Sequence, residues 1–195
     1  MQAIYKMMLC LGLLLMSMIG FAQRFEAGLV AGLNLSQIDG DRLAGFNKPG
    51  LVAGGKVATI LSERWQVSLE MLFSQQGASR TRQDDPFSAY DKIRLNFVEV
   101  PVLIQFKEWK FHVGAGVSYA RLIDFQVIDA LGGDVTDTQD FNENMYSLVF
   151  NGIYYVRENL GFEVRWFRSL NDLQQLPGGS TLIGRSLSLK LIYLL

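Results

Sequence analysis

His112 is the only histidine in the chain and the first residue to consider for chemistry. Histidine titrates near neutral pH and acts as a general base when a nucleophile and an orienting acid lie beside it. Ser68 and Ser118 are the hydroxyl residues that such a triad would use. A lone histidine is, however, far more often structural than catalytic, and His112 follows the short segment Lys107-Glu108. The pattern favours a structural histidine, and we assign no catalytic residue.

An acidic segment lies between residues 127 and 144, which contain no lysine or arginine. Several carboxylates in one flexible loop are able to chelate calcium, and some of these recur at every third position. The spacing differs from that of the EF-hand loop, whose ligands fall at alternate positions before a closing glutamate. We expect a solvated loop and predict neither a metal nor a cofactor. The acidic residues are Asp129, Asp134, Asp137, Asp140 and Glu143.

The N-terminal segment is expected to direct export. Lys6 precedes a nearly uninterrupted apolar stretch over 7–21, and small residues then precede a cleavage point at Gln23. A membrane anchor is the alternative, but about 15 apolar residues fall short of the roughly 20 that a spanning helix needs. The single cysteine, Cys10, would leave with this signal peptide. The predicted organisation is a signal peptide over 1–22 and one domain over 23–195.

The composition excludes some partners. The chain has 18 basic and 19 acidic residues, a balance that argues against nucleic acid, which selects a basic footprint. Hydrophobic residues make up 49% of the chain and aromatic residues 12%, yet no stretch after the leader approaches the roughly 20 apolar residues of a transmembrane helix. A membrane β-barrel resolves this, because its apolar residues occupy every second position.

Period-two alternation of apolar and polar residues, the signal of a half-buried strand, recurs along the chain. Strands of this length match the roughly 9–11 residues of a tilted transmembrane strand, whereas soluble strands are usually nearer 5–6. The expected strands are about 24–36, 49–61, 65–74, 93–106, 109–119, 145–157, 160–166 and 186–195.

The connections alternate between long and short. The long ones are roughly 37–48, 81–91, 127–144 and 171–184, and the short ones are 62–63, 107–108 and 157–159. Outer-membrane barrels have tight periplasmic turns, longer outer loops and an even number of antiparallel strands. The predicted fold class is therefore all-β: an eight-stranded antiparallel up-and-down transmembrane β-barrel.

The fourth strand breaks the alternation. Ile93, Leu95 and Phe97 share one phase, whereas Val98 and the apolar residues after it occupy the other. A bulge near 97–98 would restore the faces and accommodate Pro101, which cannot donate a ladder hydrogen bond. The alternative is a strand that is apolar on both faces near its periplasmic end.

The same phase argument places charged side chains in the lumen, which in a barrel of this size is just wide enough for side chains to fill. Balanced signs favour a closed salt-bridge plug over an ion-conducting pore, because a selective pore biases one sign. Within this structural network we expect Lys56 to pair with Glu70 across the 62–63 turn. The predicted lumen charges are Glu26, Lys56, Glu70, Arg94, Glu99, Glu163, Arg165 and Lys190.

The last strand must pair with the first, because lipid cannot satisfy an open sheet edge. Leu191 is then expected to face lipid and Ser188 the lumen. An arginine is expected to be costly at Leu191 and milder at Ser188.

Five segments follow one another along the chain after the leader, over 28–41, 48–55, 69–77, 95–106 and 114–122. Together, and in this order, they resemble the PorT-like outer-membrane β-barrel family over essentially the whole chain after the leader. The resemblance implies a small eight-stranded barrel in the outer membrane. One member is implicated in a secretion system for proteins that bear a C-terminal signal, which adds a secretion accessory role as an expectation. The final Leu195 departs from the aromatic residue usual at the end of such chains. The matching segments are GLVAGLNLSQIDGD (28–41), KPG (48–50) with GG (54–55), LEMLFSQQG (69–77), LNFVEVPVLIQF (95–106) and GAGVSYARL (114–122).

The sequence therefore predicts a non-enzymatic integral outer-membrane protein with a plugged polar lumen and outer loops for structural or binding roles. A narrow channel or transporter for small solutes, a barrel enzyme and a soluble lipocalin-type barrel are the alternatives. The expected partners are outer-membrane lipid, the barrel-assembly machinery during biogenesis, and a secretion component or extracellular ligand that the sequence does not identify.

Overall fold

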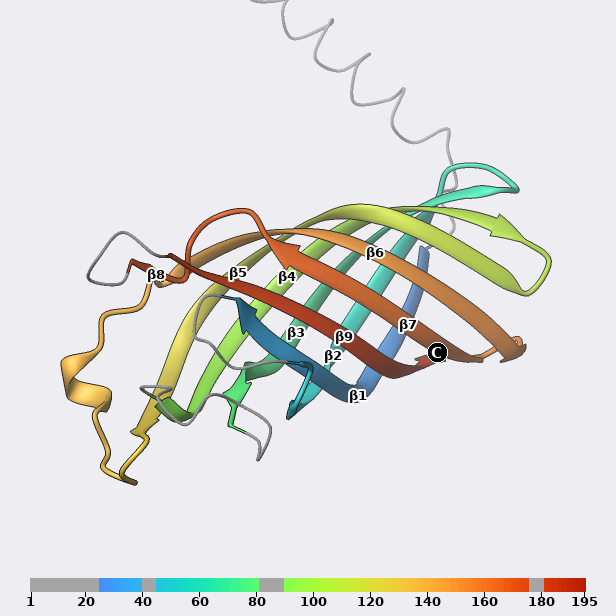
Figure 1. The fold of residues 1–195 in the computed structure, drawn as a ribbon. Coiled ribbons are helices and arrows are strands. Elements are labelled where there is room, and N and C mark those ends of the chain that lie inside the picture. The colour runs from blue at the N-terminus through green and yellow to red at the C-terminus, as the bar shows by residue number, and fades with distance from the viewer. Residues whose placement is uncertain (1–24, 40–44, 81–89, 176–180) are drawn as a thin grey trace, which may run out of the picture.

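The strands of this protein lie side by side around a barrel (Figure 1). The structure, a computed structural model, describes residues 25–39, 45–80, 90–175 and 181–195. The predicted signal peptide over 1–22 therefore lies outside the described residues. In chain order the elements are β1 (Phe25–Asp39), β2 (Lys48–Ile60), β3 (Trp65–Ser79), β4 (Tyr90–Glu108), β5 (Phe111–Asp129), η1 (Thr136–Thr138), β6 (Asn144–Arg157), β7 (Leu160–Ser169), β8 (Gln174–Gln175) and β9 (Thr181–Leu194).

Eight antiparallel strands close the barrel. The order is β1-β2-β3-β4-β5-β6-β7-β9, and β9 pairs again with β1. The closing ladder runs from Gly28 opposite Leu194 to Asp39 opposite Ile183. The predicted fold class and the pairing of the last strand with the first are confirmed. The short β8 pairs only with β9, beyond the last pair that β7 makes with it.

The connections differ from the predicted ones because the strands run further. β4 continues to Glu108, which pairs with Phe111, so the short turn is Trp109-Lys110 and the predicted turn at 107–108 is wrong. Trp109 has a φ of 51°, the left-handed conformation that a two-residue hairpin turn requires. At the other end, β1, β5 and β9 extend past their predicted limits and shorten the long connections. Among the described residues, no helix is long and apolar enough to span a bilayer.

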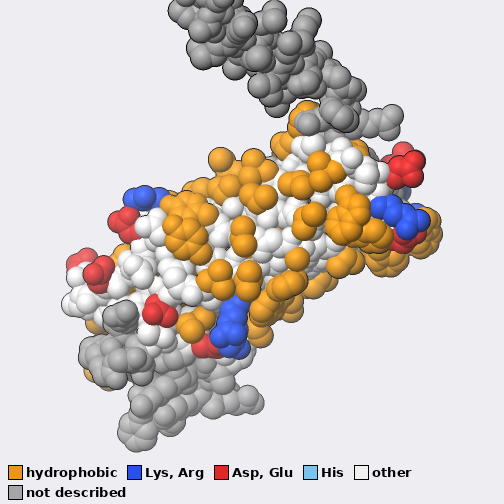
Figure 2. Space-filling view, turned by 90° about the horizontal axis from the view of Figure 1, so that it is seen from above, with side chains coloured by type: hydrophobic (Ala, Val, Ile, Leu, Met, Phe, Trp, Pro, Cys, Tyr) orange, Lys and Arg blue, Asp and Glu red, His pale blue; other side chains and the backbone are white. Residues whose placement is uncertain are grey.

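The middle of the barrel presents apolar side chains outward and polar side chains inward. Leu69 and Leu189 are about half exposed on the outer face, whereas Ser68 and Ser188 on the same strands are buried. Hydrophobic side chains are spread over the visible surface, and charged ones gather toward its ends (Figure 2). Alternation of this kind suits a wall between lipid and a side-chain-filled lumen.

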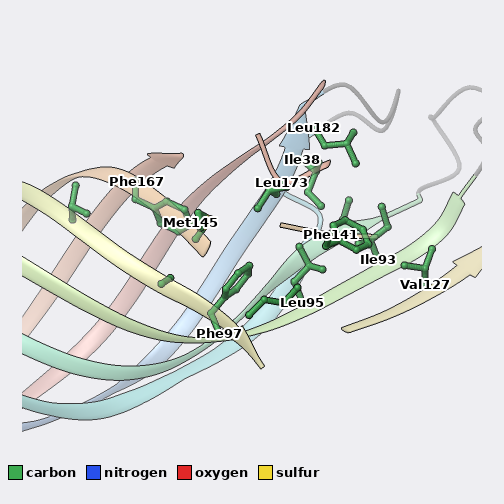
Figure 3. Close-up of a cluster of buried hydrophobic side chains, with 14 of the residues drawn as sticks. Ile38, Ile93, Leu95, Phe97, Val127, Phe141, Met145, Phe167, Leu173 and Leu182 are labelled. Atoms are coloured by element: carbon green, nitrogen blue, oxygen red, sulfur yellow. The ribbon is translucent and has the colours of Figure 1, made fainter. Parts of the chain in front are cut away.

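In the half of the barrel with the long connections, which we call the outer half, the inward side chains are apolar instead of polar. Figure 3 shows a buried apolar cluster between the strands near the end with the long connections. Inward residues of β4 contribute to it together with Phe141 and Leu173 from the connections. The outer half therefore has an apolar interior, like a soluble domain. We call these residues the apolar cluster: Ile38, Ala78, Ile93, Leu95, Phe97, Leu103, Ala120, Leu122, Val127, Phe141, Met145, Val149, Phe167, Leu173 and Leu182.

This reversal explains the phase break in β4. The register with β3 runs without interruption through Phe73 opposite Val98 and Ser74 opposite Phe97. The predicted bulge at 97–98 is therefore wrong, and Pro101 lies in a continuous ladder opposite Ser118. Toward the outer end the apolar residues Ile93, Leu95 and Phe97 face the interior, whereas further along the strand Val102 and Ile104 face outward. At the periplasmic end Gln105 points inward, so the strand is not apolar on both faces there either. An irregularity does occur next to it, on β5, where the register shifts between Asn96 and Phe97.

A substitution at Leu191 tests which face of β9 contacts lipid. Its side chain is 46% exposed and points away from the interior. The change Leu191→Arg is expected to lower the free energy of unfolding by about 2–4 kcal/mol, the cost of arginine near the bilayer midplane. Urea unfolding of the barrel in lipid vesicles measures this, with Leu191→Phe as a control that keeps an apolar surface. Unchanged stability of Leu191→Arg would contradict the assigned face.

Ser188 is the inward-facing counterpart of Leu191, and its burial changes the result that we expect for an arginine there. It is 3% exposed, and its hydroxyl donates to Asn34 Oδ1 over 2.7 Å. The lumen leaves no space for a longer side chain there, so Ser188→Arg is expected to destabilise through overpacking rather than to be mild.

Candidate functional site

The centre of the lumen holds a buried ionic network built around Arg165 on β7. Its guanidinium nitrogen Nη2 donates to both carboxylate oxygens of Glu70, over 2.8 and 2.7 Å. Its Nε donates to Glu163 over 2.7 Å. Lys190 Nζ lies 3.6 Å from the other oxygen of Glu163. The alternation of a strand puts Glu163 and Arg165 on one face, and barrel closure brings Glu70 of β3 and Lys190 of β9 to them.

Neutral polar side chains extend the network. Asn151 donates to Glu163 over 2.9 Å. Gln105 accepts through Oε1 from Gln66 over 2.7 Å and from Lys56 over 3.3 Å. These amides occupy inward positions of the same alternation, so the sequence carried a signal for them. The charged residues alone do not reveal them. Buried polar groups need such partners, because desolvation without a hydrogen bond is costly.

Six of the eight predicted lumen charges are buried in the interior: Lys56, Glu70, Glu99, Glu163, Arg165 and Lys190. Within this group Glu99 accepts a hydrogen bond from Ser118 over 3.1 Å. The group contains equal numbers of cations and carboxylates, so the ionic network as a whole is electroneutral.

The remaining two lie elsewhere. Glu26 is on the inward face of β1 but only half-buried, at the end with the short turns. Arg94 is five positions from the inward Glu99 and therefore on the opposite face of β4. It lines a hollow outside the barrel together with Asp124 and Asp134. Its prediction as a lumen residue is wrong, because the inward phase of β4 runs unbroken through Ile93.

The predicted pair of Lys56 and Glu70 is also corrected. The two residues are direct cross-strand partners, rather than diagonal neighbours. The structure describes both, and no ion pair joins them: Glu70 binds Arg165, and Lys56 donates to Gln105. Arg165 binds Glu70 through Nη2 and Glu163 through Nε, so two nitrogens of one rigid guanidinium join the two carboxylates.

His112 lies in the lumen wall near the short turns and is 7% exposed. Its ring packs against Tyr155, with ring centres 4.7 Å apart. Ser118, a candidate nucleophile, donates its hydroxyl to Glu99. The described contacts therefore give His112 a packing partner and form no nucleophile–histidine pair.

The acidic segment is a folded loop rather than a flexible chelator. Asp129 Oδ1 accepts from the backbone N–H groups of Leu131 and Gly133, over 2.9 and 2.7 Å. Asp134 accepts from Thr136, and these hydrogen bonds hold the pKa of its carboxyl below the usual value. Within the described ranges, no three acidic, histidine or cysteine side chains gather as a metal site.

The ionic network and the apolar cluster together fill the interior. Charges paired in this way are stable in a low-dielectric space only while every partner remains. An interior filled in this way suits a barrel whose strands have lipid on their outward face. The fold and its lipid-facing belt define the class: a transmembrane β-barrel of the outer membrane.

The sequence comparison agrees with this class. Residues 21–175 match the family described as the outer membrane protein beta-barrel domain, and the chain belongs to that family. It is an outer-membrane β-barrel protein. No curated protein matches the chain.

Solved structures of similar fold include Ail, the attachment invasion locus protein of Yersinia pestis. One Ail structure gives a TM-score of 0.55 at 12% identity, covering 87% of this chain and 98% of that one. Ail in complex with the heparin analogue sucrose octasulfate gives 0.51 at 11% identity, covering 88% and 99%. At this identity the likeness concerns the fold.

The ionic network predicts non-additive mutations. Glu70→Leu leaves Arg165 without one of its two carboxylates and is expected to lower the free energy of unfolding by about 3–5 kcal/mol. The double variant Glu70→Leu/Arg165→Met, which removes both charges, is expected to cost less than that single change. Urea unfolding in lipid vesicles measures both.

The exposed pair Arg64–Glu108, 3.7 Å apart, provides the matched control. Glu108→Leu is expected to change stability by less than about 1 kcal/mol, because exposed ion pairs contribute little. A double variant that is no more stable than Glu70→Leu would contradict the coupling of Glu70 and Arg165.

Proposed function

We propose that this protein is a closed, non-enzymatic outer-membrane barrel that acts through its outer surface as a structural or binding element. The observation that carries the proposal is the filled interior. An electroneutral ionic network occupies the middle of the lumen, and the apolar cluster occupies its outer half. A water-filled pathway would need both layers to open.

The arrangement of charges in the lumen favours a closed barrel over an ion-conducting one. Selective pores use rings of one sign, or a constriction in a wet channel. Here Arg165 is held by two carboxylates, and all three side chains are buried. A passing ion would have to compete with these contacts at close range. The same buried contacts speak against catalysis, because neither Glu70 nor Glu163 is accessible to a substrate.

The loop between β5 and β6 supports a role at the outer surface. Phe141 anchors it in the apolar cluster, and its ring meets Phe125 with centres 5.1 Å apart. Asn142 ties it to the β7–β9 connection by donating to the carbonyl of Asp172 over 2.8 Å. A loop fixed at both ends presents a defined surface at low entropic cost on binding.

The acidity of this loop indicates the kind of partner. The heparin analogue bound to Ail is a polyanion, whereas residues 129–143 here carry acidic groups and no base. Like charges repel, so a neutral or basic protein surface fits this loop better. The resemblance of residues 28–122 to PorT-like barrels supports a partner in protein secretion, and we propose an accessory role there. Outer-membrane lipid and the barrel-assembly machinery are the further proposed partners.

Conductance separates this proposal from the channel alternative. The purified barrel, reconstituted in a planar bilayer, is expected to show no unitary current steps above baseline, because its lumen is filled. A general porin in the same bilayer is the positive control. Reproducible steps from the unaltered protein would favour the channel.

Loop replacement tests the surface role. Exchanging residues 130–140 for a glycine-serine linker of equal length leaves Phe141 and the strands in place, so the barrel is expected to remain folded. Secretion of proteins with the C-terminal signal is expected to fall to the level of the gene deletion, measured by their amount in the medium. A deletion strain that secretes normally would overturn the accessory role.

A further inference from the structure

The end of the barrel with the short turns contains a hollow that the outer-surface role does not use. Its volume is about 580 Å³, and it is lined from the start of β1, the β4–β5 and β6–β7 turns and the end of β9. Ligand sites commonly enclose about 300–1,000 Å³. Because short turns face the periplasm in these barrels, the hollow opens there.

The wall of this hollow contains a polar atom without a partner. His112 is more than nine-tenths buried, and its Nδ1 makes no hydrogen bond within the described part of the chain. Nδ1 itself is sealed from the hollow, so the imidazole is a reporter group in the wall rather than a hydrogen-bonding group for a ligand.

Charges of both signs line the same hollow. Lys107 and Glu26 are half-buried in it, and Arg157 and Glu158 lie at its exposed edge. The described residues provide none of these four with an ion-pair partner. Opposite charges left unpaired around one hollow match a ligand that carries both signs.

The rest of the lining is apolar and aromatic. Tyr155 packs on His112 and belongs to a buried apolar group with Ile153 and Ile192. Trp109 borders the hollow from the turn, in a left-handed backbone conformation that is uncommon for a bulky residue. The hairpin turn requires this conformation, and it places the indole of Trp109 at the border of the hollow.

From this juxtaposition we propose that the periplasmic hollow binds a small zwitterion with an apolar side chain, a free amino acid or a short peptide. The carboxylate lies toward Lys107 and Arg157, and the ammonium group lies toward Glu26. The apolar side chain packs on Tyr155, beside the ring of His112. This site is independent of the outer loop and of any secretion role.

The single histidine makes the test direct. The full barrel in detergent micelles, labelled in its histidine ring, is titrated with L-phenylalanine while NMR follows the one imidazole signal of His112. We expect a saturable shift. N-acetyl-L-phenylalanine lacks the ammonium group and L-phenylalaninamide lacks the carboxylate, and each is expected to bind about tenfold more weakly, as loss of a charge-assisted hydrogen bond implies. The dipeptide Phe-Phe as a further probe separates the two sources: tighter binding than phenylalanine identifies a peptide.

Two variants test which residue binds the carboxylate of the ligand and which binds its ammonium group. Lys107→Gln is expected to weaken phenylalanine about tenfold but leave the amide unchanged, and Glu26→Gln to weaken phenylalanine but leave the N-acetyl compound unchanged. Arg168→Gln, exposed at the other end of the barrel, is the control and should change nothing. Circular dichroism verifies that each variant is folded. A shift that stays linear with concentration, or equal shifts for all probes, overturns the site. Loss of the outer loop leaves this binding intact, so the two proposals fail separately.

Discussion

Backbone hydrogen bonding in lipid is the constraint on which this structure depends. A strand edge that faces hydrocarbon leaves N–H and C=O groups without partners, at several kcal/mol each, so the sheet must close on itself. Closure through the β1–β9 ladder fixes the number of strands and gives every strand one face toward lipid and one toward the lumen. Because the lumen of eight strands is only as wide as its side chains, closure also forces Glu70, Glu163, Lys190 and Arg165 together.

The barrel meets two solvents along its length, and its interior changes with them. Where lipid lies outside, the interior is polar and ionic. Toward the end with the long connections the interior is apolar, with Phe97 and Leu182 buried in it. A soluble domain and a membrane barrel therefore share the same strands. This continuity explains why the apolar residues of β4 change from one phase of the alternation to the other while the strand runs in unbroken register beside β3.

The filled interior moves the functional surfaces to the two ends. At the outer end, hydrogen bonds and Phe141 hold the acidic loop in a defined shape. At the other end, charges of both signs line the hollow beside His112. The two ends differ in chemistry, one acidic and one of mixed sign, and the ionic network between them is neutral. A barrel of this kind offers separate contacts to the two sides of the outer membrane.

The sequence alone determined the barrel, its strand faces and most of the lumen charges, because period-two alternation is a local property written into each strand. It did not determine partners. Lys56 faces Glu70 across a turn, yet Glu70 binds Arg165, which is 95 residues away and reaches it only across the closed lumen. Arg94 was misplaced for a related reason. Alternation shows that a strand has two faces, but only the tertiary structure decides which face is inside where the surrounding solvent changes from lipid to water.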